Sequence, residues 1–163
     1  MLMNEKIKLE RRKNRNKDIR DLVANAKKVY SKFFSKEYKY NVTEAMDELG
    51  LDDELIYHLV EDYVAQIIKS IANFERLIYE LQNAKDAKKE LDYTELRELA
   101  HKNLGVARNL RIKDGEEVLY HLMHDDELEY LFTCVEALHA SAVCLKPECA
   151  FNTIQLLEVK SSF

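Results

Sequence analysis

An apolar repeat with helical spacing runs through the middle of this chain and constrains its fold more than any other feature. From residue 55 to residue 81 an apolar side chain recurs every three or four positions, and charged residues fill the intervals. Asp52 or Asp53 is placed to cap the start of this helix, which should reach about Gln82. The 163 residues include one proline and three glycines, which leaves little material for turns. We therefore expect an all-α protein.

Further helices are predicted from capping residues and apolar spacing. They cover residues 4–35, 43–50, 92–113, 116–124, 126–146 and 148–158. Residues 83–91 are typical of a connection between helices, and the Asp114-Gly115 pair is typical of a turn. We expect an antiparallel four-helix bundle over residues 42–145. An extra basic helix in residues 1–41 and a short helix or tail in residues 146–163 should flank it.

The charge of the chain is divided unevenly along its length. Residues 1–40 hold thirteen Lys/Arg and five Asp/Glu, a net charge of +8, whereas the whole chain carries −5 and residues 41–163 therefore carry −13. A basic segment of this kind can bind nucleic acid or an anionic membrane. We expect it instead to lie against the acidic body or on an acidic partner, with no nucleic-acid partner.

The cysteines and the hydropathy pattern bear on the compartment. Cys134, Cys144 and Cys149 are an odd number without CxxC spacing, which argues against a disulfide framework and a zinc site. No apolar run follows the basic start, as a signal peptide would require, and no stretch approaches the ~20 apolar residues of a membrane span. We expect a cytoplasmic monomer with reduced thiols and no membrane span.

One histidine stands out within the helix predicted around residues 96–112. At 100° per residue the apolar face comprises Leu96, Leu99, Ala100, Asn103, Val106, Ala107 and Leu110. The opposite side comprises His101, Gly105, Arg108 and Ile112. A glycine inside a helix costs about 0.5–1 kcal/mol relative to alanine. Either Gly105 only allows close helix packing beside an ordinary surface histidine, or it removes a side chain so that another molecule can approach His101.

An exposed imidazole supports one specific chemistry. A free imidazole has a pKa of about 6.5, so its neutral nitrogen is a good nucleophile near neutral pH. On a rigid helix it can attack a phosphoryl group that a partner protein holds. Nearby cations favour the anionic group, and Arg97, Lys102 and Arg108 are close in sequence. Glu98, three residues before the histidine, is placed either to orient the ring or simply to raise its pKa.

The segment from about Thr43 to Cys144 resembles a histidine phosphotransfer (Hpt) domain of bacterial multistep phosphorelays. It shares the opening at residues 49–55, the long helix and a second helix that carries the family motif. That motif is a histidine, a leucine at +2, a lysine at +3, a glycine at +4, small residues at +5 and +6, and often a glycine at +10. His101 and Gly105 match it. The departures are Asn103 at +2, Leu104 at +3, Val106 at +5 and Arg111 at +10.

The resemblance implies a four-helix bundle that carries a phosphoryl group on Nε2 of His101. The chain would then be a phosphocarrier and not a turnover enzyme, with no cofactor of its own. Its partners would be response-regulator receiver domains, a hybrid histidine kinase, or both, and the receiver would supply the aspartate and the Mg²⁺. The expected contact surface comprises Arg97, Glu98, Lys102, Leu104, Gly105, Arg108 and Ile112.

Two other classes of function stay open at the level of sequence. One is a non-catalytic adaptor, a pseudo-Hpt bundle that binds receivers without accepting phosphate. The other is a metal-dependent bundle enzyme. The Glu98-x-x-His101 and Glu136-x-x-His139 pairs match di-iron spacing, and His121-x-x-His124 followed by Asp125 has metal-ligand spacing. Because His101 is predicted to point outward, and because a polar helix end explains His121 and His124 equally well, we expect no metal site.

Overall fold

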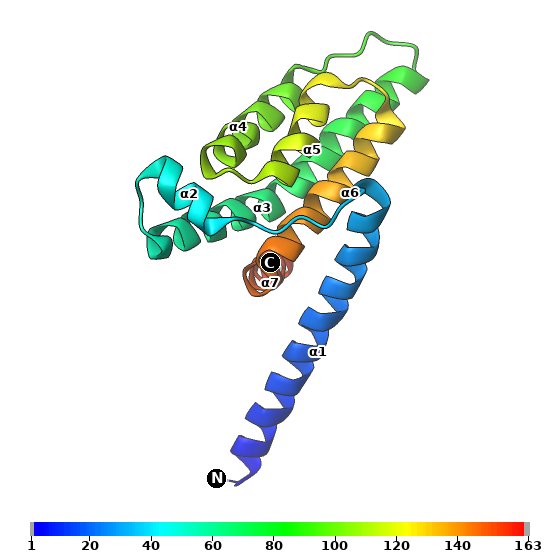
Figure 1. Cartoon of the computed structure of the whole chain (residues 1–163). Helices are drawn as coiled ribbons and strands as arrows, with labels where there is room; N and C mark the ends of the chain where they lie inside the picture. Colours follow the sequence, from blue (N-terminus) through cyan, green and yellow to red (C-terminus); the bar gives the residue numbers. More distant parts are fainter. Residues whose placement is uncertain (1, 162–163) are drawn as a thin grey trace.

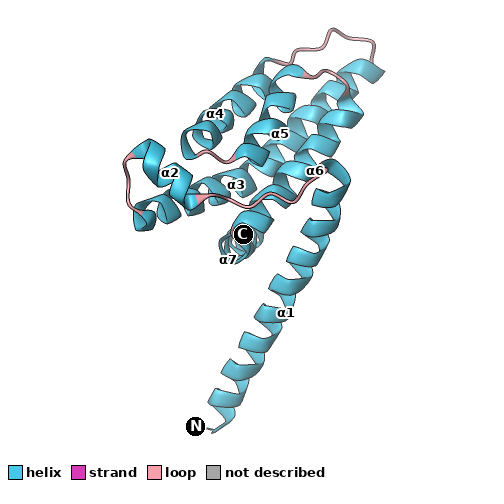
Figure 2. Ribbon diagram, in the orientation of Figure 1, coloured by secondary structure: helices cyan, strands magenta, loops and turns pink. Residues whose placement is uncertain are grey.

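The computed structural model describes residues 2–161, and over that range the chain forms helices and no strand (Figures 1 and 2). The all-α class is therefore confirmed. The helices, in chain order, are α1 (Leu2–Phe33), α2 (Val42–Leu49), α3 (Asp53–Asp86), α4 (Thr94–Leu110), α5 (Lys113–His124), α6 (Leu128–Leu145) and α7 (Pro147–Ser161). The last two residues of the predicted C-terminal tail lie outside the described range.

The boundaries of α2 and α3 follow from local chemistry. Asn41 and Asp52 have extended backbones, and each side chain accepts a hydrogen bond from the backbone N–H three residues later. Gly50 ends α2 in the left-handed conformation with φ 67°, which glycine adopts without steric cost. Pro147 begins α7, where its missing N–H is not needed.

Four helices close a ring around the main core. α3 packs against α4 and α6, and α5 packs against α4 and α6. α3 runs the full length of this ring, and the loop at the top of Figure 1 reverses the chain into α4. Helices α1 and α7 contact the outside of the ring, chiefly along α6 and α3. The largest fully buried side chains include Tyr63, Phe74, Leu104 and Leu138.

A buried polar cluster joins α1, α5 and α6. The Asp114 side chain is 8% exposed, and its Oδ2 accepts hydrogen bonds from Tyr30 Oη at 3.1 Å and Ser141 Oγ at 2.9 Å. Its Oδ1 accepts from the backbone N–H of Gly115 at 2.7 Å. Burial raises the pKa of Asp114, and it outweighs these hydrogen bonds, which lower it. The cluster attaches the C-terminal half of α1 to the ring.

This cluster corrects the prediction of a turn at Asp114 and Gly115. Both residues lie inside α5 and are buried. The turn comes earlier, at Arg111, which has φ 62°. Glycine is needed at position 115 because a Cβ there would collide with Tyr63 Oη on α3. The Asp114-Gly115 pair, which is typical of a turn, therefore marks a close approach between two helices in this protein.

Other predicted boundaries shift by several residues. α3 continues to Asp86 through part of the expected connection, and α4 ends at Leu110 instead of Lys113. The predicted cap Asp92 accepts a hydrogen bond from the backbone N–H of Thr94, although Tyr93 occupies the N-cap position. α6 begins after Glu127, not after Asp125 or Asp126.

The first part of α1 stands away from the rest of the molecule (Figure 1). Residues 2–14 are all exposed, and the first part-buried residue is Arg15. Its Nη2 donates a hydrogen bond to Asn152 Oδ1 on α7 at 2.9 Å, and its guanidinium lies over the Phe151 ring. The basic segment therefore does not lie against the acidic body over its first thirteen described residues, which was one of the two placements expected from charge; the other, on an acidic partner, stays a prediction.

Within the described residues, α6 is the one helix long and apolar enough to cross a membrane by length and composition. More than half of this stretch is buried inside the structure, as in the core helix of a soluble protein. The three cysteines are free, and Cys134 on α6 is fully buried.

Candidate functional site

The candidate site lies on the outer side of α4. The residues of α4 that face the core are Leu96, Ala100, Asn103, Leu104, Ala107 and Leu110. His101 and Gly105 are exposed, and they stand one turn apart on the opposite side, about 6 Å along the helix axis. The predicted exposure of both residues is confirmed.

The space beside Gly105 is open. A Cβ placed on this glycine would meet no atom within 4 Å outside its own helical neighbourhood. No other helix therefore uses the missing side chain for close packing, which was the alternative explanation for the glycine. An incoming molecule can reach the backbone of α4 one turn from the His101 imidazole.

Two arginines near His101 are already engaged with α5. Arg97 Nη1 donates a hydrogen bond to the Leu122 carbonyl at 2.8 Å, and burial lowers the pKa of this guanidinium. Arg108 Nε forms an ion pair with Glu116 Oε1 at 3.1 Å. Both members of this second pair are exposed. An exposed pair contributes only about 0–1 kcal/mol, so Arg108 can exchange Glu116 for another anion at little cost.

The remaining predicted surface residues divide into two groups. Glu98 and Lys102 are exposed, as expected. Leu104 and Ile112 do not belong to the surface, because their side chains are 2% and 0% exposed. Leu104 packs inward from α4, and Ile112 follows the end of α4 and points into the core before α5 begins.

The apolar face of α4 is also rotated from the predicted one. Val106 was expected in the core but is 40% exposed, and Leu104 takes the buried position. Asn103 is buried at 1% because its amide Nδ2 donates a hydrogen bond to the Leu99 carbonyl on its own helix. A polar residue therefore occupies the core without losing a hydrogen-bond partner.

The C-terminal end of α4 is held by the segment that precedes α2. Tyr40 Oη donates a hydrogen bond to the Leu110 carbonyl at 2.6 Å, and Tyr38 Oη donates to the Arg111 carbonyl at 3.0 Å. The Arg111 guanidinium also pairs with Glu48 on α2. These contacts satisfy carbonyls that the helix end leaves without partners. They hold the helix that carries His101 in a defined position.

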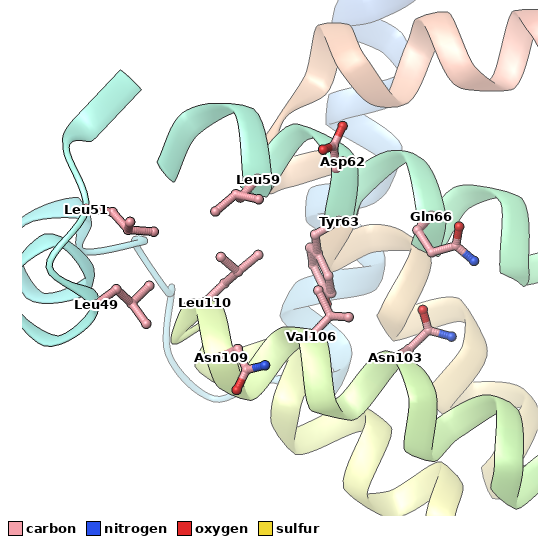
Figure 3. Close-up of a pocket in the computed structure, with 10 residues that line it drawn as sticks. All are labelled: Leu49, Leu51, Leu59, Asp62, Tyr63, Gln66, Asn103, Val106, Asn109 and Leu110. Carbon is pink, nitrogen blue, oxygen red and sulfur yellow. The ribbon is translucent and has the colours of Figure 1, made fainter. Parts of the chain in front are cut away.

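A groove lies between α3 and α4 and is closed at one end by α2 (Figure 3). Its volume is about 600 Å³. The lining residues are Leu49, Leu51, Leu59, Asp62, Tyr63, Gln66, Asn103, Val106, Asn109 and Leu110. No local sequence pattern predicts this groove, because its residues come from three helices and from the loop between α2 and α3. Val106 marks the groove most clearly, because its apolar side chain is exposed there.

The other histidine pairs do not assemble into a metal centre. Among residues 2–161 no group of three His, Cys, Asp or Glu side chains is placed to hold a metal ion. His121 Nδ1 lies 2.8 Å from Asp125 Oδ2, and the His124 ring packs on the Tyr120 ring. Burial lowers the pKa of His139 on α6.

No protein-family model matches this sequence, and the searches of curated proteins and of solved structures found no significant match. The functional assignment therefore depends on the residues and their geometry.

Proposed function

We propose that this chain is a histidine-containing phosphotransfer protein that carries a phosphoryl group on His101 between receiver domains of a phosphorelay. The observation that carries the proposal is the pairing of exposed His101 with Gly105, whose missing side chain leaves open space one turn away. A receiver must bring its aspartate and bound Mg²⁺ close to the imidazole, and a bare helix surface permits that approach.

The backbone at Arg111 gives independent support. The Hpt motif often has a glycine ten residues after the histidine, where this chain has Arg111. Arg111 adopts φ 62°, in the left-handed region that favours glycine. The ring of α3, α4, α5 and α6 is also consistent with the four-helix bundle of that family.

The proposed transfer is a single displacement at phosphorus. The lone pair of the neutral His101 nitrogen forms an N–P bond, while the P–O bond to the receiver aspartate breaks and its electron pair stays on the carboxylate. The same displacement in the reverse direction passes the phosphoryl group from His101 to the aspartate of a second receiver. Lys102 and Arg108 are the exposed cations of α4 on either side of Gly105, and they are placed to offset the charge of the phosphoryl group.

The buried Leu104 explains how this chain differs from the family motif. A lysine at this position would have to leave its ammonium group in the core, where an unpaired charge is costly. In this chain the cation must therefore come from another position on α4. Arg108 suits this role because its present ion pair with Glu116 lies at the surface and is weak.

The test is phosphoryl transfer from receiver domains charged with acetyl phosphate. The intact chain should acquire an acid-labile, base-stable label, and His101→Gln should lose it completely. His58→Gln is the matched control, because it removes another exposed histidine on α3 and should keep the label. A label that persists in His101→Gln would refute the proposed site.

The second candidate is a receiver-binding adaptor that accepts no phosphate. It is favoured by the absence of the family lysine, since Leu104 replaces it. Receiver binding by the intact chain, without any label under conditions that charge the receiver, would select this alternative.

A further inference from the structure

The basic arm, defined here as residues 2–20 of α1, is a surface that the proposed phosphotransfer does not use. Of its residues only Arg15 and Ile19 are part-buried, and the others are exposed. None of the ion pairs among residues 2–161 involves an arm residue. The arm stands away from the other helices in Figure 1. Apart from Arg15, which contacts α7, its charges are therefore available to a partner.

The arm is strongly basic. Its cations are Lys6, Lys8, Arg11, Arg12, Lys13, Arg15, Lys17 and Arg20, and its acids are Glu5, Glu10 and Asp18, which gives a net charge of +5. The segment from residue 41 onward carries −13. A polyanion is repelled by that acidic body and attracted to the arm. Because the arm projects from the body, a polyanion can bind the arm at a distance from the acidic residues.

The cations occupy two opposite sides of the helix. At 100° per residue Lys6, Lys13 and Lys17 cluster within a narrow sector, and Lys8, Arg11 and Arg12 spread over the opposite side. The exposed apolar residues do not form a continuous stripe, because Leu2 and Leu9 border the first basic sector on one side and Met3 and Ile7 lie beyond it on the other. A helix that lies in a membrane surface needs a continuous apolar face, which is missing here.

A helix with two basic sides matches the major groove of duplex DNA. An α-helix with its side chains is about 10–12 Å wide, and the major groove is about 12 Å wide with a phosphate strand on each wall. The flat surface of an acidic protein would contact one side only. The major groove of duplex RNA is too deep and narrow to admit side chains in this way.

We propose that the basic arm binds in the major groove of duplex DNA, with Lys6, Lys13 and Lys17 facing one phosphate strand and Lys8, Arg11 and Arg12 facing the other. This revises the expectation that the chain has no nucleic-acid partner. That expectation placed the basic segment on the acidic body or on an acidic partner, and residues 2–14 are exposed in the structure. The inference is independent of the phosphotransfer chemistry at His101.

The experiment measures binding of the full chain to a labelled duplex DNA by fluorescence anisotropy over a range of salt concentrations. The test variant is Arg11→Gln/Arg12→Gln/Lys13→Gln. The matched control, Lys85→Gln/Lys88→Gln/Lys89→Gln, makes the same change in net charge at exposed lysines near the end of α3. All six positions are exposed, and circular dichroism checks that helix content is retained.

The intact chain and the control should bind the duplex alike. The arm variant should bind at least about tenfold more weakly at low salt, and its slope of log affinity against log salt should fall by about 3, one unit for each lost phosphate contact. Equal affinities of the arm variant and the control would overturn the proposal. So would equal binding to duplex RNA of the same sequence, or binding to phosphatidylserine vesicles in place of DNA.

Discussion

At the scale of single residues, the site depends on which side chains of α4 reach the surface. His101 and Arg108 are exposed, whereas Leu104, three residues after the histidine, is 2% exposed and packs in the core. The position that carries a lysine in the Hpt motif is therefore part of the structural support of α4 in this chain. Substitutions can separate the structural role of position 104 from the role of the surface residues.

Leu104→Lys should not restore the family motif but should destabilise the fold. It removes buried apolar contacts and introduces a charge without a partner, so we expect a loss of about 3 kcal/mol or more in the free energy of unfolding. Urea denaturation measures this loss. Val106→Lys, at a 40% exposed position of the same helix, is the control and should cost less than about 1 kcal/mol. A loss for Leu104→Lys as small as that of the control would show that position 104 tolerates a charge.

At the scale of elements, α4 combines a rigid support with a weakened centre. Tyr38, Tyr40 and Arg111 hold its C-terminal end through the hydrogen bonds and the ion pair described above. Gly105 lies near its middle, in helical conformation, with open space on its outer side. The glycine lowers the stability of the helix and is not required by packing. The open space beside it is consistent with the proposed approach of a receiver to His101.

Substitution of Gly105 should separate stability from transfer. Gly105→Ala should raise the free energy of unfolding by about 0.5–1 kcal/mol, because alanine loses less backbone entropy in a helix. Gly105→Leu should leave the fold intact and block phosphoryl transfer, because the side chain would occupy the approach of the receiver. The measurements are urea denaturation and the rate of labelling from a charged receiver.

Ala72→Leu is the matched control for the larger side chain, since Ala72 is exposed on α3. It should leave the labelling rate unchanged. If Gly105→Leu accepts the label at the native rate, the steric role of Gly105 is wrong.

At the scale of the whole molecule, Asp114 connects helices that are distant in sequence. It joins α5 to Tyr30 on α1 and to Ser141 on α6. Burial raises its pKa in the folded protein above the ordinary value of 3.8. The folded state therefore binds the proton more tightly than the unfolded state. The contribution of this group to stability is greatest at low pH and declines as pH rises from 3.8 through the folded-state pKa.

Asp114→Asn should remove this pH dependence. The free energy of unfolding of the variant, relative to that of the native chain, should increase as pH rises from about 4 to about 7. Urea denaturation at several pH values measures the difference. Glu117→Gln, at an exposed position of the same helix, serves as the control. A difference that stays constant or changes in the opposite direction would contradict the raised pKa.

Much of the candidate site could be predicted from sequence because it depends on position around one helix. The exposure of His101 and Gly105 follows from their angle relative to Leu96, Ala100 and Ala107. The predicted face was rotated by part of a turn, which misplaced Leu104 and Val106. The helical period gives the angles between the residues of one helix. Which part of the helix surface is buried depends on the neighbouring helices that cover it.

The sequence by itself determined that this chain is helical, because the apolar period of α3 and the shortage of glycine and proline permit little else. It also determined that an imidazole faces outward near the middle of α4. Only the tertiary structure decided the rest: the burial of Leu104, the inclusion of Asp114 and Gly115 in a helix, and the groove of Figure 3. Each of these depends on contacts between segments far apart in the chain, which no local pattern records.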